Sequence, residues 1–569
     1  MFRNKTARQH NFATVPRADI PRSKFRFRQT RKQAFNASEL IPIMVEEVLP
    51  GDVWQHQENI MARFATPIAP AVDDIDLETF YFFVPNRITA AISFTGQPHG
   101  NSWEMLISGQ ENSTMPLLAP PNVEGEWPIP VNSVLDHMGI PPGDYTAALA
   151  FNALPIWAYF KIYNDWFRDQ NLQDEWEWAP DYSTTNLTNS ISNGTDAWDM
   201  MALRINKRHD YFTSSLPWPQ KGDPVELPLG STAPVIADLS NVAMDSNRPL
   251  FTADDTVWPG PSIQEPLYVV NNNPYPSWVA NPGNAGGEVM RWGTQTGLVA
   301  DLSAATAATI NAIRLAFQTQ KLLERDARGG SRYVEQLLAH FGVRSPDYRL
   351  QRPEYLGGSK IPVNVNPVAQ TAAYDAEPSD SASAVGNLGA EMHAQGSHRT
   401  FQYAAVEHGY IIGIAAVRST PTYQQGLRRH WIARNTRLDF YFPAFAMLGE
   451  QAVNTREIYT PLDTTPVNAT WGYQERWAEM RYTPNEITGV LRSTVAQPMD
   501  WWHYAEEFAD EPALNADFIT DKTQETLARS LATAPSAQWS AQIIMDILHD
   551  SVVARLMPTY SVPGLIDHF

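Results

Sequence analysis

The chain has 569 residues, a net charge of −20 at pH 7 and 43% apolar residues, so it can bury a large core and is not a disordered polymer. It contains no Cys, which excludes disulfides, thiolate zinc sites and cysteine nucleophiles. Only 18% of its residues are charged and 11% are aromatic, a balance typical of surfaces that are covered by partners, although it also suits a sugar-binding surface.

The N-terminal segment differs in charge from the rest of the chain. Residues 1–32 hold ten Lys or Arg and one Asp, whereas the remaining residues hold 32 basic and 61 acidic side chains. An acidic body with a basic end indicates two different electrostatic environments. We interpret residues 1–32 as a basic arm that binds single-stranded nucleic acid, because cations neutralise phosphates and aromatic rings stack on unpaired bases.

The candidate contact residues of this arm are Arg17, Arg22, Lys24, Phe25, Arg26, Phe27, Arg28, Arg31 and Lys32. An alternative interpretation stays open from these residues alone. In it, Phe25 and Phe27 pack against the body of the protein, and the cations are only solvated.

Further along the chain, hydrophobic periodicity predicts strands first and helices later. Runs of β-branched and aromatic residues between turn residues predict strands over 40–49, 59–66 and 77–84. Apolar residues at helical spacing predict helices over 154–171, 303–328 and 332–341. Two more strands are predicted over 406–418 and 437–445, so the pattern indicates one β-core with long insertions.

Residues 220–300 contain ten prolines among Gly and Asn, which favours a long, loop-rich insertion. Four aromatic residues in it are candidates for contact with a receptor: Trp258, Tyr268, Tyr275 and Trp278. Exposed aromatic side chains offer broad contact area. An alternative interpretation of at least equal weight is that these aromatic residues join neighbouring copies of the insertion.

A search for catalytic and metal-binding patterns finds none that is specific. No two of the 13 His are closer than five residues, and the nucleotide-binding glycine motifs are absent. The acidic clusters 73–76 and 506–507 are interpreted as solvated faces, and the charged group 204–210 as a contact between subunits. We therefore expect no enzymatic activity, no metal and no cofactor.

Several long strings resemble the major capsid proteins of the Microviridae, in particular the gokushovirus branch. They are FYFFVPNR (80–87), YNDWFRDQNL (163–172), KRHDYFTSSLPWPQKG (207–222), ERDARGGSRYVEQLLAHFGVRSPDYRLQRPEYLGG (324–358), EHGYIIGIAAVRSTPTYQQGL (407–427), GEQAVNTREIY (449–459) and GYQERWAEMRY (472–482). Because the strings are long, collinear and spread over most of the chain, the signal is highly specific.

The resemblance implies a mainly β fold, an eight-stranded antiparallel viral jelly roll with large helical and loop insertions. It implies a coat protein that self-assembles into a T=1 icosahedral shell around a circular single-stranded DNA genome, with residues 1–32 facing the interior. Residues 33–569 would form one jelly-roll domain, and residues 220–300 a surface protrusion near the threefold axes that contributes to host attachment.

The partners that the resemblance implies are further copies of the chain, the DNA genome, an internal scaffolding protein, a DNA pilot protein and a host surface receptor, but no membrane. The protein is expected in the virion after assembly in the host cytoplasm, since no signal peptide or membrane-spanning run is present. The alternative is a carbohydrate-binding or carbohydrate-active all-β protein, for which the 18 Trp and the acidic composition speak.

Overall fold

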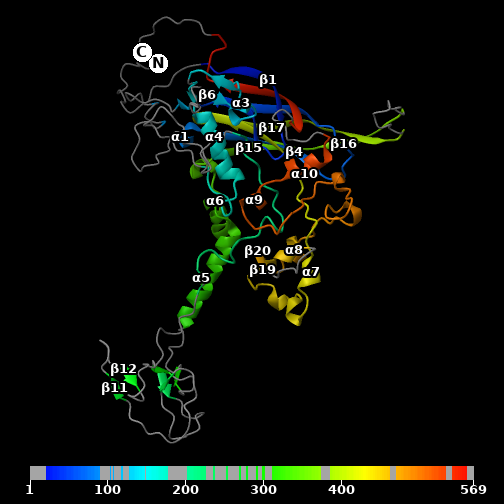
Figure 1. The fold of residues 1–569 in the computed structure, drawn as a ribbon. Helices are drawn as coiled ribbons and strands as arrows, with labels where there is room; N and C mark the ends of the chain where they lie inside the picture. The colour runs from blue at the N-terminus through cyan, green and yellow to red at the C-terminus, as the bar shows by residue number, and fades with distance from the viewer. Residues whose placement is uncertain are drawn as a thin grey trace, which may run out of the picture. The chain divides into compact units, whose positions relative to one another are not determined.

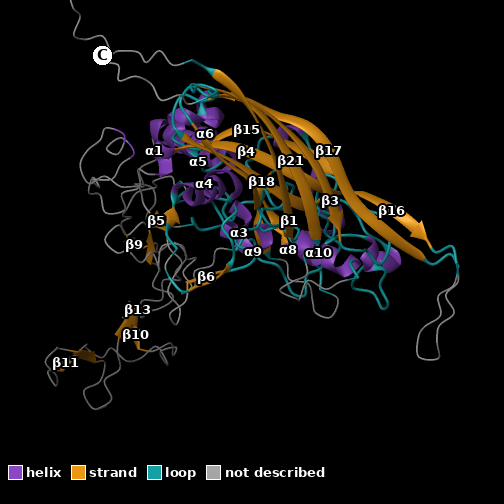
Figure 2. Cartoon of the chain, turned by 90° about the horizontal axis from the view of Figure 1, so that it is seen from above, coloured by secondary structure: helices purple, strands orange, loops and turns teal. Residues whose placement is uncertain are grey.

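The computed structural model describes residues 21–89, 127–147, 149–176, 201–223, 310–372, 385–461, 469–532 and 541–560, with short pieces between 103 and 118 and between 225 and 300. Two antiparallel sheets form its central part (Figures 1 and 2). One sheet has the order β1 (Ser23–Phe35), β21 (Ile543–Arg555), β3 (Val53–Phe64), β17 (Leu388–Ala404) and β16 (Asn364–Ala369). The other has the order β15 (Glu354–Pro362), β4 (Ile75–Pro85), β18 (Gly409–Ser419) and β2 (Ile41–Val48).

The path of the chain through these sheets is that of a jelly roll. It runs β1, β2, β3, β4, β15, β17, β18 and β21, and it changes sheet at every step except from β4 to β15, which are neighbours in one sheet. Strand β16 is an addition that forms a hairpin with β17 at the edge of the five-stranded sheet. The predicted jelly roll is therefore confirmed, and strands 40–49, 77–84 and 406–418 lie where the sequence predicts them.

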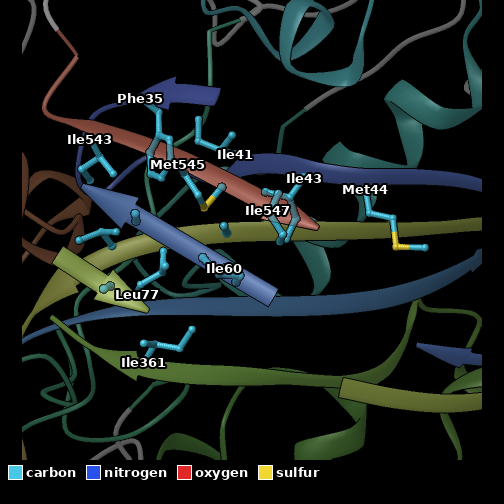
Figure 3. Close-up of a cluster of buried hydrophobic side chains, with 14 of the residues drawn as sticks. Phe35, Ile41, Ile43, Met44, Ile60, Leu77, Ile361, Ile543, Met545 and Ile547 are labelled. Carbon is cyan, nitrogen blue, oxygen red and sulfur yellow. The ribbon is translucent and has the colours of Figure 1, made fainter. Parts of the chain in front are cut away.

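A hydrophobic core fills the space between the two sheets. Alternate residues of β21 are buried, as the burial pattern of Ile543, Met545 and Ile547 shows, and they meet Ile60 of β3 and Leu77 of β4 (Figure 3). Burial of each such side chain contributes about 1.5–3 kcal/mol relative to leaving it in water. The two-residue alternation therefore fixes the register of each strand, because a slip by one residue exposes its apolar set.

Strand β4 is buried on both of its faces. Tyr81 and Phe83 point into the core between the sheets, whereas Phe82 and Val84 pack in a second cluster with helix α4 (Leu154–Ile162). This explains why its sequence FYFFV does not alternate between apolar and polar residues. Helix α4 has Pro155 in its first turn and continues into the π-helical turn η2 (Tyr163–Phe167), which agrees with the helix predicted over 154–171.

The remaining elements lie in two long insertions, one between β4 and β15 and the other between β18 and β21. Those between β4 and β15 include α1 (Asn86–Thr89), β5 (Leu117–Leu118), β6 (Trp127–Ile129), α3 (Val134–Met138), β7 (Gly143–Tyr145), β8 (Phe151–Asn152), α5 (Ile310–Gly329), α6 (Tyr333–Gln336), η4 (Leu337–Phe341) and η5 (Asp347–Leu350). Those between β18 and β21 include α7 (Arg429–Ile432), η6 (Arg437–Asp439), η7 (Pro443–Phe445), β19 (Glu450–Asn454), α8 (Thr455–Ile458), β20 (Thr470–Glu475), η8 (Ala478–Met480), η9 (Gly489–Leu491), η10 (Asp500–Trp502), α9 (Ala516–Ile519) and α10 (Thr523–Ser530).

Residues Gly222–Leu323 form a compact unit of their own, and residues Met1–Lys221 with Glu324–Phe569 form the other. In the smaller unit, β9 (Val235–Ala237) pairs with β14 (Leu298–Ala300), β10 (Phe251–Ala253) with β13 (Met290–Trp292), and β11 (Tyr268–Val270) with β12 (Ser277–Val279). The pairs are nested one inside the other along the chain. The segment predicted as loops thus contains three separate two-stranded antiparallel sheets with strands of three residues each.

The structure differs from the sequence predictions in two places. The strand predicted over 437–445 is wrong, since this stretch forms the 3-10 turns η6 and η7. The carboxylate of Asp439 accepts hydrogen bonds from the backbone N–H groups of Asn435 and Thr436, and a proline begins η7, so the chain turns instead of extending. The basic arm also ends earlier than residue 32, because β1 already begins at Ser23.

Candidate nucleic-acid face and the joints behind it

Strand β1 carries its cations on the solvent side of the five-stranded sheet. It pairs with β21 over its whole length, so that Arg26 lies opposite Val552 and Arg28 opposite Asp550. Side chains of a strand alternate between the two faces of its sheet. The even-numbered residues of β1 therefore share one face, and the cations on that face are exposed: Lys24, Arg26, Arg28 and Lys32.

Two aspartates of β21 partly neutralise these cations. Arg26 donates to both carboxylate oxygens of Asp550 at 2.8 and 2.5 Å, and the guanidinium of Arg28 lies 3.6 Å from the same carboxylate. The hydrogen bond and charge of Arg26 lower the pKa of Asp550. Lys32 lies 3.6 Å from Asp546. Four cations thus face two carboxylates, and the face of these two strands keeps a positive excess.

The same solvent face continues across β3 and β17 with polar groups. Cross-strand pairing places Gln57 of β3 between Asp550 and Arg399, and Asn59 between Leu548 and Ser397. Arg63 at the end of β3 pairs with Glu391. The face therefore combines guanidinium groups with side-chain amides and hydroxyls, which can hydrogen-bond to phosphates and to base edges.

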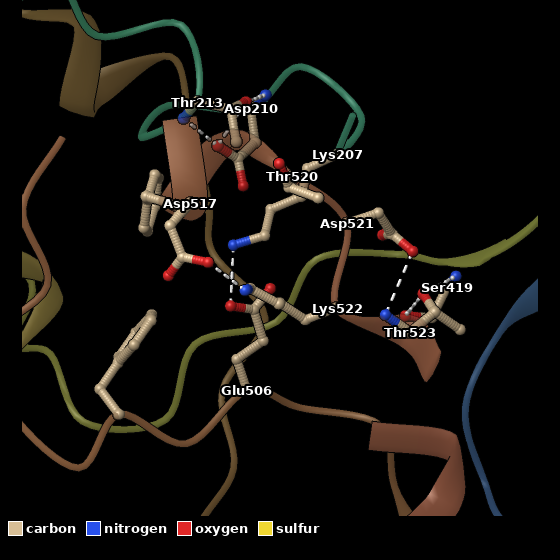
Figure 4. A network of polar contacts seen from close by, with 12 residues as sticks. Lys207, Asp210, Thr213, Ser419, Glu506, Asp517, Thr520, Asp521, Lys522 and Thr523 are labelled. Atoms are coloured by element: carbon tan, nitrogen blue, oxygen red, sulfur yellow. Dashed lines mark hydrogen bonds and ion pairs between the residues drawn. The ribbon is translucent and has the colours of Figure 1, made fainter. Parts of the chain in front are cut away.

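Behind the four-stranded sheet, a network of ion pairs and hydrogen bonds connects the two insertions with the sandwich (Figure 4). We call this network the joint. The ammonium of Lys207, whose side chain is 1% exposed, lies 2.8 Å from Glu506 and 4.2 Å from the ring centre of Phe518. Burial raises the pKa of Glu506, while the positive charge of Lys207 opposes that rise. Such a pair keeps its charges only because each partner compensates for the lost hydration of the other.

A second part of this joint ties the insertions to strand β4. Arg208 donates to Asp76 at 2.7 Å and to Glu78 at 2.9 Å, and Arg418 of β18 donates to Glu78 at 2.7 Å. One sequence interpretation is therefore wrong, because Asp76 and Glu506 of the acidic clusters are buried partners and not parts of solvated faces. The ion pairs of Lys207 and Arg208 lie within the chain, and the interpretation of the charged group 204–210 as a contact between subunits stays a prediction.

Comparison with known proteins gives the family. The family model described as "Capsid protein (F protein)" matches residues 13–565. The chain belongs to this capsid protein family. It is 38% identical to "Capsid protein VP1" of Bdellovibrio phage phiMH2K, 36% to that of Chlamydia phage 1 and 35% to that of Spiroplasma virus 4, and each match covers at least 98% of both proteins. The resemblance to capsid proteins of the Microviridae is thus confirmed.

Membership in this family makes the capsid protein a structural component of a phage particle, one that assembles with copies of itself. Within the described residues, no three His, Asp or Glu side chains are grouped as metal ligands would be. The helices described here include none long and apolar enough to cross a membrane.

The predicted nucleic-acid residues of the capsid protein do not all lie together. Phe25 and Phe27 stack on each other at 6.4 Å, on the face opposite to the cations, and Phe27 contacts Trp54 of the core. Arg31 donates to the backbone oxygen of His137 at 3.0 Å, and burial lowers its pKa. Phe25 is half-buried and Phe27 is 40% exposed, so the rings pack only partly against the body, and stacking on unpaired bases stays a prediction for them.

The other predicted site residues are placed only in part. Arg22 is exposed just before β1, and Arg17 lies outside the described residues. In the smaller unit, Tyr268 begins β11 and Trp278 lies on β12, opposite Val269, while Trp258 and Tyr275 lie outside the described residues. Sequence reasoning missed the amide-rich face of β3 and β17, although the alternation Gln55, Gln57, Asn59 in a strand signals it.

Proposed function

We propose that this capsid protein builds a T=1 icosahedral shell around a circular single-stranded DNA genome, with the solvent face of its five-stranded sheet directed at the DNA. The observation that carries the proposal is the gathering of Lys24, Arg26, Arg28 and Lys32 on one sheet face of a chain whose net charge is −20. An otherwise acidic subunit repels phosphate, so DNA binds where the cations are concentrated.

This face suits single strands of any sequence. Its cations lie along one strand, and the neighbouring strands offer amide and hydroxyl groups that hydrogen-bond to many base edges. The residues before β1, including Arg17 and Arg22, extend the positive charge toward the interior of the shell. The rings of Phe25 and Phe27 stabilise the strand and leave phosphate contacts to their charged neighbours.

The remaining parts of the proposal concern partners. An internal scaffolding protein and a DNA pilot protein assemble with the shell in the host cytoplasm, and the segment 220–300 takes part in attachment to a host surface receptor. The three short antiparallel strand pairs within it support a segment with a folded backbone. The alternative of a carbohydrate-active protein has little support, because the family to which the chain belongs is a structural one.

The genome-facing sheet is tested with a double variant, Lys24→Gln with Arg28→Gln. We expect the slope of log affinity against log salt for a single-stranded oligonucleotide to become shallower by about 1.4, that is about 0.7 for each phosphate that the sheet no longer neutralises. Arg344→Gln with Arg349→Gln removes the same charge from exposed positions near η5 and serves as the control. An equal change of slope in both double variants would contradict the assignment of the sheet.

The shell itself is tested on purified particles. Electron microscopy should show closed particles of icosahedral symmetry built from sixty copies, the number that T=1 requires, and nuclease treatment should leave a circular single-stranded DNA inside them. Open sheets, filaments or particles that contain duplex DNA would count against this part of the proposal.

A further inference from the structure

The insertion between β18 and β21 exposes an unusual amount of apolar surface in one short stretch. Between residues 431 and 448, seven large apolar side chains are 38–97% exposed: Trp431, Leu438, Phe440, Tyr441, Phe442, Met447 and Leu448. We call these seven residues the 431–448 segment. Soluble monomers seldom expose such a concentration of large apolar groups, because exposed apolar surface favours association with other molecules.

The segment is held in place although its side chains are exposed. The indole N–H of Trp477 donates to the backbone oxygen of Phe445 at 2.9 Å, and the ring of Trp477 meets that of Tyr441 edge-on at 5.4 Å. Arg434 donates to Glu479 at 2.7 Å. An apolar surface fixed in this way loses little conformational entropy when a partner covers it.

A hollow of about 440 Å³ adjoins the segment. Trp431 is one of the residues that line it, and the stacked rings of Tyr211 and Tyr482 and the charged pair Arg429 and Glu457 line it as well. Its aromatic walls and paired charges suit the insertion of a side chain from another protein. Interfaces commonly combine such an anchoring hollow with a surrounding apolar surface.

The exposed area matches what one partner contributes to a stable contact. If a large side chain offers about 150–250 Å² when it is fully exposed, the seven residues present on the order of 800 Å². About 800 Å² on each side is the area of a standard protein interface. DNA is a poor candidate for this surface, because Arg434 is already paired with Glu479 and the guanidinium of Arg437 lies over the ring of Phe442.

We propose that the 431–448 segment is covered by a neighbouring copy of this chain in the assembled shell, and that the adjoining hollow receives a side chain of that copy. The inference rests on the proposed function, because it needs a shell in which copies meet. A closed shell brings several different surfaces of each subunit into contact, and a rigid apolar segment beside a hollow has the anatomy of one of them.

Cysteine labelling tests the proposal, since the natural chain has no Cys. Met447→Cys places a single thiol at a position that is 97% exposed in the isolated subunit, and Val72→Cys provides a control at a position that is 80% exposed. The rate of maleimide labelling is measured in intact particles and in subunits dissociated from them. We expect labelling at position 447 to be at least tenfold slower in particles, with less than a threefold change at position 72.

Equal labelling of position 447 in particles and in subunits would overturn the proposal, and so would equal protection of both positions. A double variant, Trp431→Lys with Met447→Lys, gives a second readout. It should yield soluble folded subunits that form no particles, whereas Val72→Lys assembles. Normal assembly of the double variant would also overturn the inference. If the unmodified chain forms no particles, the proposed function is wrong. If it forms particles and the double variant does so as well, only the proposed interface is wrong.

Discussion

Two histidines are buried in the core of the sandwich, and their charge state affects its stability. His56 lies 2.7 Å from the hydroxyl of Ser551 and 3.4 Å from His549, and its ring stacks on Phe401. Burial lowers the pKa of His56 to about 3 and that of His549 to about 4. Both rings are therefore neutral in the folded protein at neutral pH.

From these pKa values we predict that the contribution of His56 and His549 to the free energy of unfolding falls as the pH drops from about 6.5 to about 3. The unfolded chain takes up protons on these histidines below pH 6.5, whereas the folded chain takes them up only near pH 3–4, so acid favours unfolding. In His56→Phe, the slope of the free energy of unfolding against pH should be smaller by up to about 1.4 kcal/mol per pH unit in this window. Urea titrations of dissociated subunits at a series of pH values measure it.

This prediction is tested by comparing the pH slope of the free energy of unfolding between His56→Phe and the unmodified chain. Burial raises the pKa of Glu58, which accepts a hydrogen bond from Tyr81 at 2.6 Å, and this carboxyl acts in the opposite direction because its protonation favours the folded state. Its contribution is common to both proteins and cancels in the difference. Identical slopes for the two proteins would show that His56 is already protonated in the folded subunit or does not titrate separately.

At the scale of elements, strand β1 belongs both to the sheet and to the nucleic-acid face. It is hydrogen-bonded to β21 along all of its residues from Ser23 to Phe35, and Phe35 is buried in the core. We predict that removal of residues 1–20 leaves the free energy of unfolding within about 1 kcal/mol of the full chain but weakens DNA retention, because strand β1 is kept while Arg3, Lys5, Arg8 and Arg17 are lost.

Removal of residues 1–35, in contrast, should destabilise the subunit strongly or prevent folding. It takes away a complete strand and exposes the apolar edge of β21. Thermal unfolding of the two truncated chains, together with the DNA content of any particles, distinguishes the two effects. The division would be wrong if the shorter deletion destabilised the subunit as much as the longer one.

The elements that the sequence predicts correctly are those whose apolar residues are buried, such as β4, β18 and α4. In α4, Ile156, Tyr159 and Phe160 are buried as their spacing predicts, and most of the other residues of this helix are buried as well. The stretch 437–445 fails because its apolar residues alternate as in a strand, yet no strand lies beside it, and the same residues are exposed. Periodicity alone does not distinguish apolar residues that lie on an exposed surface from apolar residues that lie in a core.

The candidate site was predictable in its charge but not in its geometry. The count of Lys and Arg before residue 33 locates the cations, while only the pairing of β1 with β21 shows which of them point to solvent. Arg31 is counted as a contact residue from sequence, but the backbone oxygens near residue 137 bind its guanidinium. Such long-range pairs depend on the tertiary fold, and a local pattern carries no information about them.

For the whole molecule, the division into two units predicts that the larger unit folds alone. Lys221, where the chain leaves the larger unit, donates to Ser331 at 2.7 Å, and Ser331 lies seven residues after Glu324, where the chain re-enters this unit. Replacing residues 222–323 by a flexible linker of about ten residues should shift the melting temperature of the subunit by no more than a few degrees. Host adsorption of particles should be lost if this segment makes the attachment.

An insertion of equal length made elsewhere provides the control for this deletion. A ten-residue linker placed between Gly413 and Ile414 of β18 interrupts a strand that is buried on both faces, and it should prevent folding. A deletion of residues 222–323 that abolishes folding would contradict the independence of the two units. Normal adsorption of the deleted particles would instead contradict only the role in attachment.

The neighbouring strands β4 and β15 pair as the two arms of a hairpin do, with Glu354 opposite Phe83, although residues 86–353 separate them in the chain. Because the entropy of closing a loop grows only with the logarithm of its length, each doubling of this excursion costs only about 0.6 kcal/mol. The junction therefore tolerates additions of almost any size at small thermodynamic expense. An engineer who wishes to display a foreign domain on the particle can therefore insert it at this junction with little loss of stability.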